Sequence, residues 1–290
     1  MGSVKFRTYH EVPGEDASGL LDQVFALRQR VQARLGRVNR LVAIASGKGG
    51  VGKSHVTALL ALELRRLGKS VGVLDADLHG PTIAKLLEAR GPLEIDEHEV
   101  QPATGREGIL VFSTDLLLND QQPLTWREIE PGGRVPSAEC RVPSSENFLF
   151  RGPRESNVLR ESLADVAWGD LDFLLVDLPP GTDRLEDLAS LAPSLSGVLV
   201  VTLPTDESRR SVARAMHAAA ASGVRLLGIV ENMSGYACPT CGTTGPLFQG
   251  DAGAILASEF AVPLIAKIPF GRFPFPLSPF PLDQFLELLP

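Results

Sequence analysis

The chain has 290 residues, of which 44% are hydrophobic and 22% are charged, values typical of a globular protein with a substantial core. Its formal net charge of −7 argues against broad nucleic-acid binding, which usually requires a basic face. The sequence lacks an apolar run as long as a membrane span and an apolar signal-peptide core near the N-terminus. Three cysteines are too few for a disulfide framework, so we expect a cytoplasmic protein without a membrane partner.

The first predicted element is an amphipathic helix between Ser18 and Arg37. Its apolar residues recur at helical spacing, with arginines between them: Leu21, Val24, Phe25, Val31 and Leu35. We interpret residues 1–38 as an N-terminal extension. Its helix is expected to pack on the main domain or on a partner, and packing on the main domain is the simpler interpretation.

Residues 39–270 alternate apolar runs with helical patterns. The predicted strands cover residues 41–46, 71–75, 109–113, 172–177, 197–202, 224–231 and 263–268. The predicted helices cover residues 53–67, 82–89, 156–166, 206–222 and 252–260. Continuous apolar runs are typical of strands buried on both faces of a parallel sheet. The alternation therefore predicts an α/β fold, with a doubly wound, mostly parallel sheet flanked by helices.

Two segments interrupt this pattern. Residues 114–148 carry prolines, glycines and polar residues around Trp126, which indicates an insertion or a long loop. Residues 271–290 form a tail rich in proline and phenylalanine. Proline excludes a regular helix through most of the tail, so we expect it to lie along the surface as an extended strap.

The segment from Gly47 to Ser54 follows a predicted strand and opens a predicted helix. It matches the phosphate-binding pattern of glycine, four residues, then Gly-Lys-Ser/Thr. Glycines let successive N–H groups point at phosphate oxygens, and the helix adds the positive end of its dipole. Lys53 should reach the β- and γ-phosphates, and the Ser54 hydroxyl should hold Mg²⁺. The predicted nucleotide-binding residues are Gly47, Lys48, Gly49, Gly50, Val51, Gly52, Lys53, Ser54 and His55.

Carboxylates follow two of the predicted strands, where open α/β sheets bind their ligands. Asp77 could orient the water that attacks the γ-phosphate. Asp75 could support the magnesium shell, or it could cap the helix that begins near Pro81. Asp177 ends an apolar run of the Walker B form and is predicted to hold Mg²⁺. Lys48, a second lysine in the loop, could reach a phosphate across a dimer interface as a charge clamp.

Cys238 and Cys241 form a second centre of possible chemistry. Two thiols at this spacing, flanked by Gly235, Pro239 and Gly242, can bind one soft metal or a cluster iron. A closed tetrahedral site needs four ligands, so one chain supplies half and two chains could supply the whole. A redox dithiol and two inert thiols are alternatives. Metal or cluster binding is favoured because the pair lacks the setting of a thioredoxin fold.

Together these features resemble the deviant-Walker ATPases of the MinD/ParA superfamily and, within it, the Mrp-type iron–sulfur cluster carriers. The matching segments are SGKGGVGKS at 46–54, DADLHGP at 75–81, RGP at 151–153, DLPPGT at 177–182 and ENMS at 231–234, which leads into the cysteine pair. The resemblance implies a homodimer that binds ATP with Mg²⁺ at the subunit interface and hydrolyses it slowly.

The resemblance also implies roles for particular residues. Lys48 would be the cross-subunit lysine, Asp77 the switch residue for water activation, and Asn232 the contact to the adenine ring. Cys238 and Cys241 would share a bridging [4Fe–4S] cluster with the second subunit, and the nucleotide state would control its delivery to client apoproteins.

The chain departs from the family pattern at two places. His55 stands where the family usually has a threonine beside the α-phosphate. Asp183 directly follows Thr182, where the family usually continues with Gly-Asp, a change that could stiffen the second switch. Two other functions stay open: a metallochaperone-type ATPase for Zn²⁺ or Ni²⁺, and a nucleotide switch that positions a partner.

Overall fold

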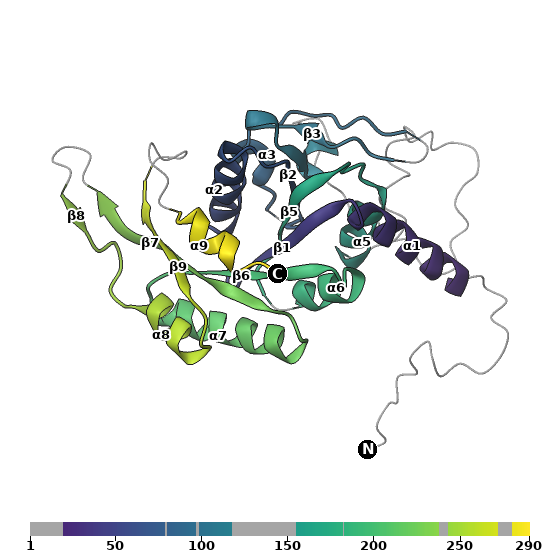
Figure 1. Cartoon of the computed structure of the whole chain (residues 1–290). Coiled ribbons are helices and arrows are strands. Elements are labelled where there is room, and N and C mark those ends of the chain that lie inside the picture. Colours follow the sequence, from purple (N-terminus) through teal and green to yellow (C-terminus); the bar gives the residue numbers. More distant parts are fainter. Residues whose placement is uncertain are drawn as a thin grey trace, which may run out of the picture.

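The protein folds around one twisted sheet, seen in a computed structural model (Figure 1). The structure describes residues 20–78, 80–96, 99–117, 155–181, 183–237, 243–271 and 280–290. Most of the predicted insertion, both residues of the pair Cys238 and Cys241, and the segment 151–153 lie outside these ranges.

The described residues contribute nine strands to the sheet, in the order β3-β4-β2-β5-β1-β6-β7-β8, with β9 also paired to β7. The strands are β1 (Val38–Ser46), β2 (Val71–Asp75), β3 (Ala103–Thr104), β4 (Leu110–Phe112), β5 (Leu171–Asp177), β6 (Leu195–Thr202), β7 (Leu226–Ala237), β8 (Thr244–Gly245) and β9 (Leu264–Phe270). The pairs β3–β4 and β7–β8 are antiparallel, and the other pairs are parallel. The predicted doubly wound, mostly parallel fold is therefore confirmed.

Helices flank the sheet, as Figure 1 shows. They are α1 (Leu20–Leu35), α2 (Lys53–Arg66), α3 (Ile83–Leu86), α5 (Glu155–Asp165), α6 (Asp183–Leu191), α7 (Asp206–Ala221), α8 (Ala252–Glu259) and α9 (Leu282–Glu287), with short 3₁₀ turns η2 (Arg106–Gly108) and η3 (Thr114–Leu117). Because β–α–β crossovers are right-handed, α2 and α3 cover one face of the sheet, and α5, α6 and α7 cover the other.

The middle of the sheet explains the continuous apolar runs. Residues 41–45 of β1 are at most 3% exposed, because helices cover both faces and β5 and β6 pair with both edges. Parallel strands point their carboxyl ends the same way, so β1, β2, β5 and β6 all end at one edge of the sheet. That edge carries the phosphate loop and the predicted carboxylates.

The N-terminal helix packs on the main domain. α1 contacts α5 and β1, and its residues Val31 and Leu35 are buried. Arg30 pairs with Asp165 at 2.6 Å and Arg34 pairs with Glu99 at 2.7 Å. The predicted helix is confirmed, and its C-terminal half packs on the main domain, whereas the predicted apolar residue Phe25 is 60% exposed.

The tail differs from its prediction. Residues 280–290 turn back into the protein and form α9, with Phe280 5% exposed and Phe285 fully buried. The two rings meet edge to face with centroids 5.8 Å apart, and α9 contacts α2. The expected surface strap is wrong for this part of the tail, because burial of two phenylalanines outweighs the local preference of proline for extended chain.

Two helices also differ from expectation. α3 ends at Leu86, because Glu88 takes a left-handed conformation with φ of 56° and Ala89 N–H donates to Ala84 O at 2.9 Å, closing the helix. α6 was not predicted, and it occupies the connection between β5 and β6. None of the described helices is both long enough and apolar enough to cross a membrane.

Candidate nucleotide-binding site

The phosphate loop connects the end of β1 to the first residue of α2. Gly50 and Gly52 both have φ of +78°, a conformation that other residues adopt at a cost. A Cβ at Gly52 would lie 2.2 Å from Asn232 Nδ2, whereas one at Gly50 would meet nothing within 4 Å. At Gly47 a Cβ would lie 2.2 Å from the backbone of Ser211 in α7. The loop therefore needs glycine for its backbone turn and for close approach to α7 and β7.

Lys53, Ser54 and Asp177 meet beneath the loop. Asp177 is fully buried at the end of β5, and its Oδ2 lies 2.8 Å from Lys53 Nζ in an ion pair. Ser54 Oγ donates to the same oxygen at 2.6 Å, and Thr57 Oγ1 donates to Oδ1 at 2.7 Å. In the described part of the chain, buried Lys53 Nζ has no partner with hydrogen-bond geometry. The site thus holds a buried ammonium with donors to spare, next to two oxygen ligands of the kind that Mg²⁺ prefers.

Asp75 is surrounded by donors. Its Oδ2 accepts hydrogen bonds from the N–H groups of Thr82 at 3.0 Å and Ile83 at 3.1 Å, and from Ser113 Oγ at 3.2 Å. Its Oδ1 accepts from Asp77 N–H at 3.2 Å. Burial, and next the charge of Asp177, raise the pKa of Asp75 to about 7. These are the contacts of the helix cap, one of the two roles considered for this residue, and Mg²⁺ ligation by Asp75 stays a prediction.

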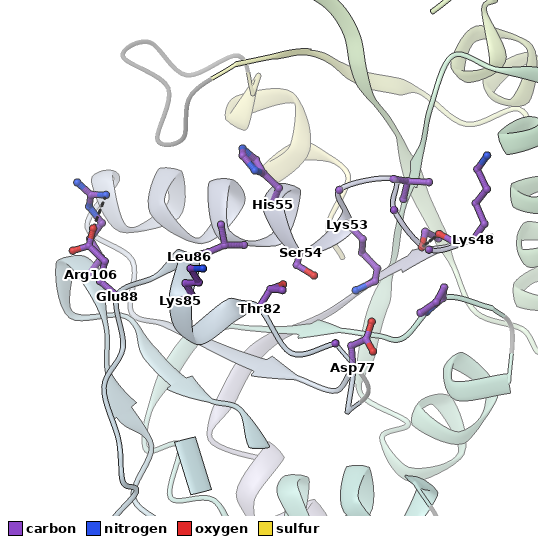
Figure 2. A pocket seen from close by; sticks show the side chains of 17 residues that line it. Lys48, Lys53, Ser54, His55, Asp77, Thr82, Lys85, Leu86, Glu88 and Arg106 are labelled. Carbon is purple, nitrogen blue, oxygen red and sulfur yellow. Dashed lines mark hydrogen bonds and ion pairs between the residues drawn. The ribbon is translucent and has the colours of Figure 1, made fainter. Parts of the chain in front are cut away.

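A cavity of about 640 Å³ lies in front of the loop. It is lined by the loop itself, by Asp77 and Thr82 from the segment after β2, and by Lys85, Leu86, Glu88 and Arg106 at its far end (Figure 2). Lys53, Ser54 and Asp77 converge on the same part of this cavity in Figure 2. The predicted phosphate-binding lysine, hydroxyl and water-orienting carboxylate therefore share one space.

Two loop residues behave differently. The Lys48 side chain points away from Lys53 and Asp77 (Figure 2), so its ammonium group lies apart from the Lys53 ammonium and the Asp77 carboxylate. His55 also lines the cavity, and burial lowers the pKa of its imidazole. A neutral imidazole brings no positive charge to a phosphate.

Asn232 contacts the loop. It is 4% exposed near the middle of β7, and its Nδ2 donates to Val51 O at 2.8 Å. Its predicted contact with adenine stays a prediction, and the observed contact was not foreseen. Thr57 was also missed as a partner of Asp177, although a hydroxyl one helical turn after Lys53 was a usable signal.

The fold and this geometry agree with comparisons with known proteins. The model of a ParA family, described as NUBPL iron-transfer P-loop NTPase, matches residues 37–135 and 129–273. The chain belongs to this family. The two matched ranges contain every predicted site residue, including Cys238 and Cys241.

Named relatives of the chain support the assignment. An iron–sulfur cluster carrier protein of Saccharolobus solfataricus is 33% identical over 277 residues, covering 93% of this chain and 86% of the relative. A cytosolic Fe-S cluster assembly factor of Bos taurus, NUBP2, is 38% identical over 241 residues, covering 81% and 80%. Among solved structures, a nucleotide-binding protein of Archaeoglobus fulgidus in complex with ADP is 31% identical with a TM-score of 0.64, covering 90% of this chain and 89% of that one.

Proposed function

We propose that this chain is a nucleotide-dependent iron–sulfur cluster carrier that acts as a homodimer. The relatives named above as cluster carrier and assembly factor support the cargo, and the ADP complex of the Archaeoglobus protein supports the nucleotide. The observation that carries the proposal is the buried group of Lys53, Ser54 and Asp177 beneath a complete phosphate loop, in a chain that also has a Cys-x-x-Cys pair.

The residues present fit MgATP. Lys53 would bind the β- and γ-phosphates with the donors it has to spare. Ser54 Oγ and Asp177 would hold Mg²⁺, which when bound withdraws negative charge from phosphate oxygens. Mg²⁺ usually takes its remaining ligands from phosphates and water, so a serine and an aspartate are a sufficient protein contribution.

Hydrolysis would depend on residues around the same cavity. Asp77 lines the cavity close to Lys53 and Ser54 and would orient a water molecule toward the terminal phosphate. The Lys48 side chain points away from Lys53 and Asp77 (Figure 2), and in a dimer it would reach the nucleotide of a second copy. A chain without its partner would lack this charge, so we expect slow hydrolysis of ATP to ADP and phosphate.

The cluster is the cargo of the protein. Cys238 and Cys241 from each of two chains would supply the four thiolates that a [4Fe–4S] cluster needs. The recipients would be client apoproteins, and the setting would be the cytosol, as for the bovine relative.

Anaerobic reconstitution with iron and sulfide tests this proposal. The protein should gain a thiolate-to-iron absorbance band with about one cluster per dimer, as four ligands require. Replacing Cys238 and Cys241 with alanine should abolish it. Cys140→Ala, which removes the third cysteine of the chain, is the matched control and should retain the band.

A second measurement separates the cluster carrier from a metallochaperone. Metal and sulfide analysis of protein purified without oxygen should find iron and sulfide in near-equal amounts. Zinc or nickel without sulfide would contradict the cluster and indicate a metallochaperone. A cluster retained by the double cysteine variant would show that the ligands were assigned wrongly.

A further inference from the structure

Asn232 makes a contact with the phosphate loop to which the proposed function assigns no role. Its amide group donates to Val51 O at 2.8 Å and lies so close to Gly52 that a Cβ there would be 2.2 Å from Nδ2. At 4% exposed, the side chain is held against the backbone of the phosphate loop. A movement of that backbone on phosphate binding would therefore act directly on the Asn232 side chain.

The part of β7 that precedes Asn232 is held in the sheet by several contacts. Glu231 is buried, accepts a hydrogen bond from Gly253 N–H at 2.8 Å and forms an ion pair with Lys267 at 3.2 Å. It also pairs with Thr202 of β6 and Lys267 of β9. Up to Asn232, therefore, β7 is held within the sheet by pairing on both edges and by the contacts of Glu231.

After Asn232, the backbone and the pairing of β7 become irregular. Met233 takes a left-handed conformation with φ of 54°, which is uncommon for residues other than glycine. The register of β7 with β9 shifts between Asn232 and Tyr236. The last residues, Tyr236 and Ala237, pair with β8 and β9 at the border of the sheet. The regular pairing of β7 with β9 is therefore interrupted directly after Asn232.

We propose that Asn232 is a positioning residue that couples the phosphate loop to the Cys238–Cys241 pair. The coupling runs from Val51, through its hydrogen bond with the Asn232 amide, to the left-handed residue Met233 and then to the end of β7. Cys238 is the next residue after Ala237, so the loop contact and the first thiol belong to one continuous segment. An effect of nucleotide on a bound cluster rests on the proposed function, whereas an effect of nucleotide on the two thiols does not.

The coupling predicts that nucleotide changes the behaviour of the end of β7 within one chain. The test uses Mg·ADP and Mg·ATPγS at saturating concentration, with the protein dilute enough that light scattering reports a monomer. Hydrogen exchange of amides 233–237 and iodoacetamide alkylation of Cys238 and Cys241 are measured with and without nucleotide. In the wild type we expect a change of about fivefold or more, the lower range of coupling between sites. Alkylation of Cys140 is the internal reference.

The variants are Asn232→Ala, which removes the amide, and Asn232→Asp, which keeps its size but loses the donor. Both should lose the nucleotide response at saturating nucleotide. Thr202→Val is the matched control, because it removes a buried hydrogen-bonding group from the adjacent strand without a contact to the loop. It should retain the response.

A second measurement needs no variant, because coupling between two sites is reciprocal. Wild-type protein alkylated at Cys238 and Cys241 should therefore bind Mg·ADP with a changed affinity. A wild type without a response, a response retained in both Asn232 variants, or one lost in Thr202→Val would overturn the inference. Cluster loading is not measured in any of these arms, so failure of the proposed function would be seen separately, in the reconstitution.

Discussion

Asp75 combines two opposing influences on one carboxyl group. Four donors surround its oxygens, which favours the carboxylate, but burial and the neighbouring charge of Asp177 raise its pKa to about 7. In the unfolded chain the pKa is near the ordinary value of 3.8. Between these two values the folded protein binds more protons than the unfolded chain. The free energy of unfolding therefore falls as the pH rises through this window.

Replacement of Asp75 by asparagine should remove that dependence. At low pH the variant should be the less stable protein, because its amide N–H faces the N–H of Asp77. Between about pH 4 and pH 8 the unfolding free energy of the wild type should fall, relative to that of the variant, by up to about 4 kcal/mol. Urea titrations across this range, without nucleotide or Mg²⁺, measure the difference.

The control for this measurement is Asp170→Asn. Arg37 lowers the pKa of exposed Asp170 through a hydrogen bond and its charge, so the pH dependence that this variant removes has the opposite sign. Parallel pH profiles for the wild type and Asp75→Asn would contradict the assigned pKa.

At the scale of elements, α9 supports the helix that follows the phosphate loop. It contacts α2, which begins with Lys53, and it inserts the fully buried ring of Phe285. Phe285→Ala should lower the free energy of unfolding by about 3–5 kcal/mol, as expected for removal of a buried ring. Phe270→Ala, at a position 50% exposed, should cost much less. Urea unfolding compares the two, and equal costs would mean that α9 is not part of the core.

The long strands could be predicted because their residues are buried on both faces. The apolar run at 41–45 is a direct consequence of its central place between β5 and β6. α6 also left a signal, since Leu185, Leu188 and Leu191 recur at helical spacing and are buried, but this pattern was overlooked. β3 and β8 have two residues each and exist through pairing with longer strands, so local sequence cannot reveal them.

The site could be predicted only in part. Lys53, Ser54 and Asp177 belong to patterns in which spacing carries the chemistry. The contact from Asn232 to Val51 joins residues 181 positions apart, and no local pattern specifies which loop atom a strand residue will reach. Likewise, the left-handed Glu88 that ends α3 depends on packing around that turn rather than on the preference of glutamate.

At the scale of the whole molecule, Lys48 makes the proposed dimer testable. Lys48→Ala should bind ATP nearly as tightly as the wild type, because its side chain points away from Lys53 and Asp77. Its ATP hydrolysis should fall by about a factor of 10³, the lower range for loss of a charge supplied by a second subunit. Calorimetry with ATP and phosphate release at several protein concentrations measure both.

Wild-type hydrolysis per chain should rise with protein concentration, whereas that of Lys48→Ala should not. Lys85→Ala is the control, since this lysine lines the cavity of its own chain at the far end from the loop. Hydrolysis independent of concentration, with light scattering that shows only monomers, would contradict the dimer.

The order of strands in the sheet has a consequence for synthesis of the protein. β1 is translated early, but its two neighbours begin at Leu171 and Leu195. At usual ribosomal rates the unpaired edges of β1 wait roughly 8 to 30 seconds for β6 to be made. For most of that time Asp177, the ion-pair partner of Lys53, has not been made, so the nucleotide site is incomplete. Because unpaired strand edges and exposed apolar surface promote aggregation, we expect the demand for chaperones to rise with translation pauses between the two segments.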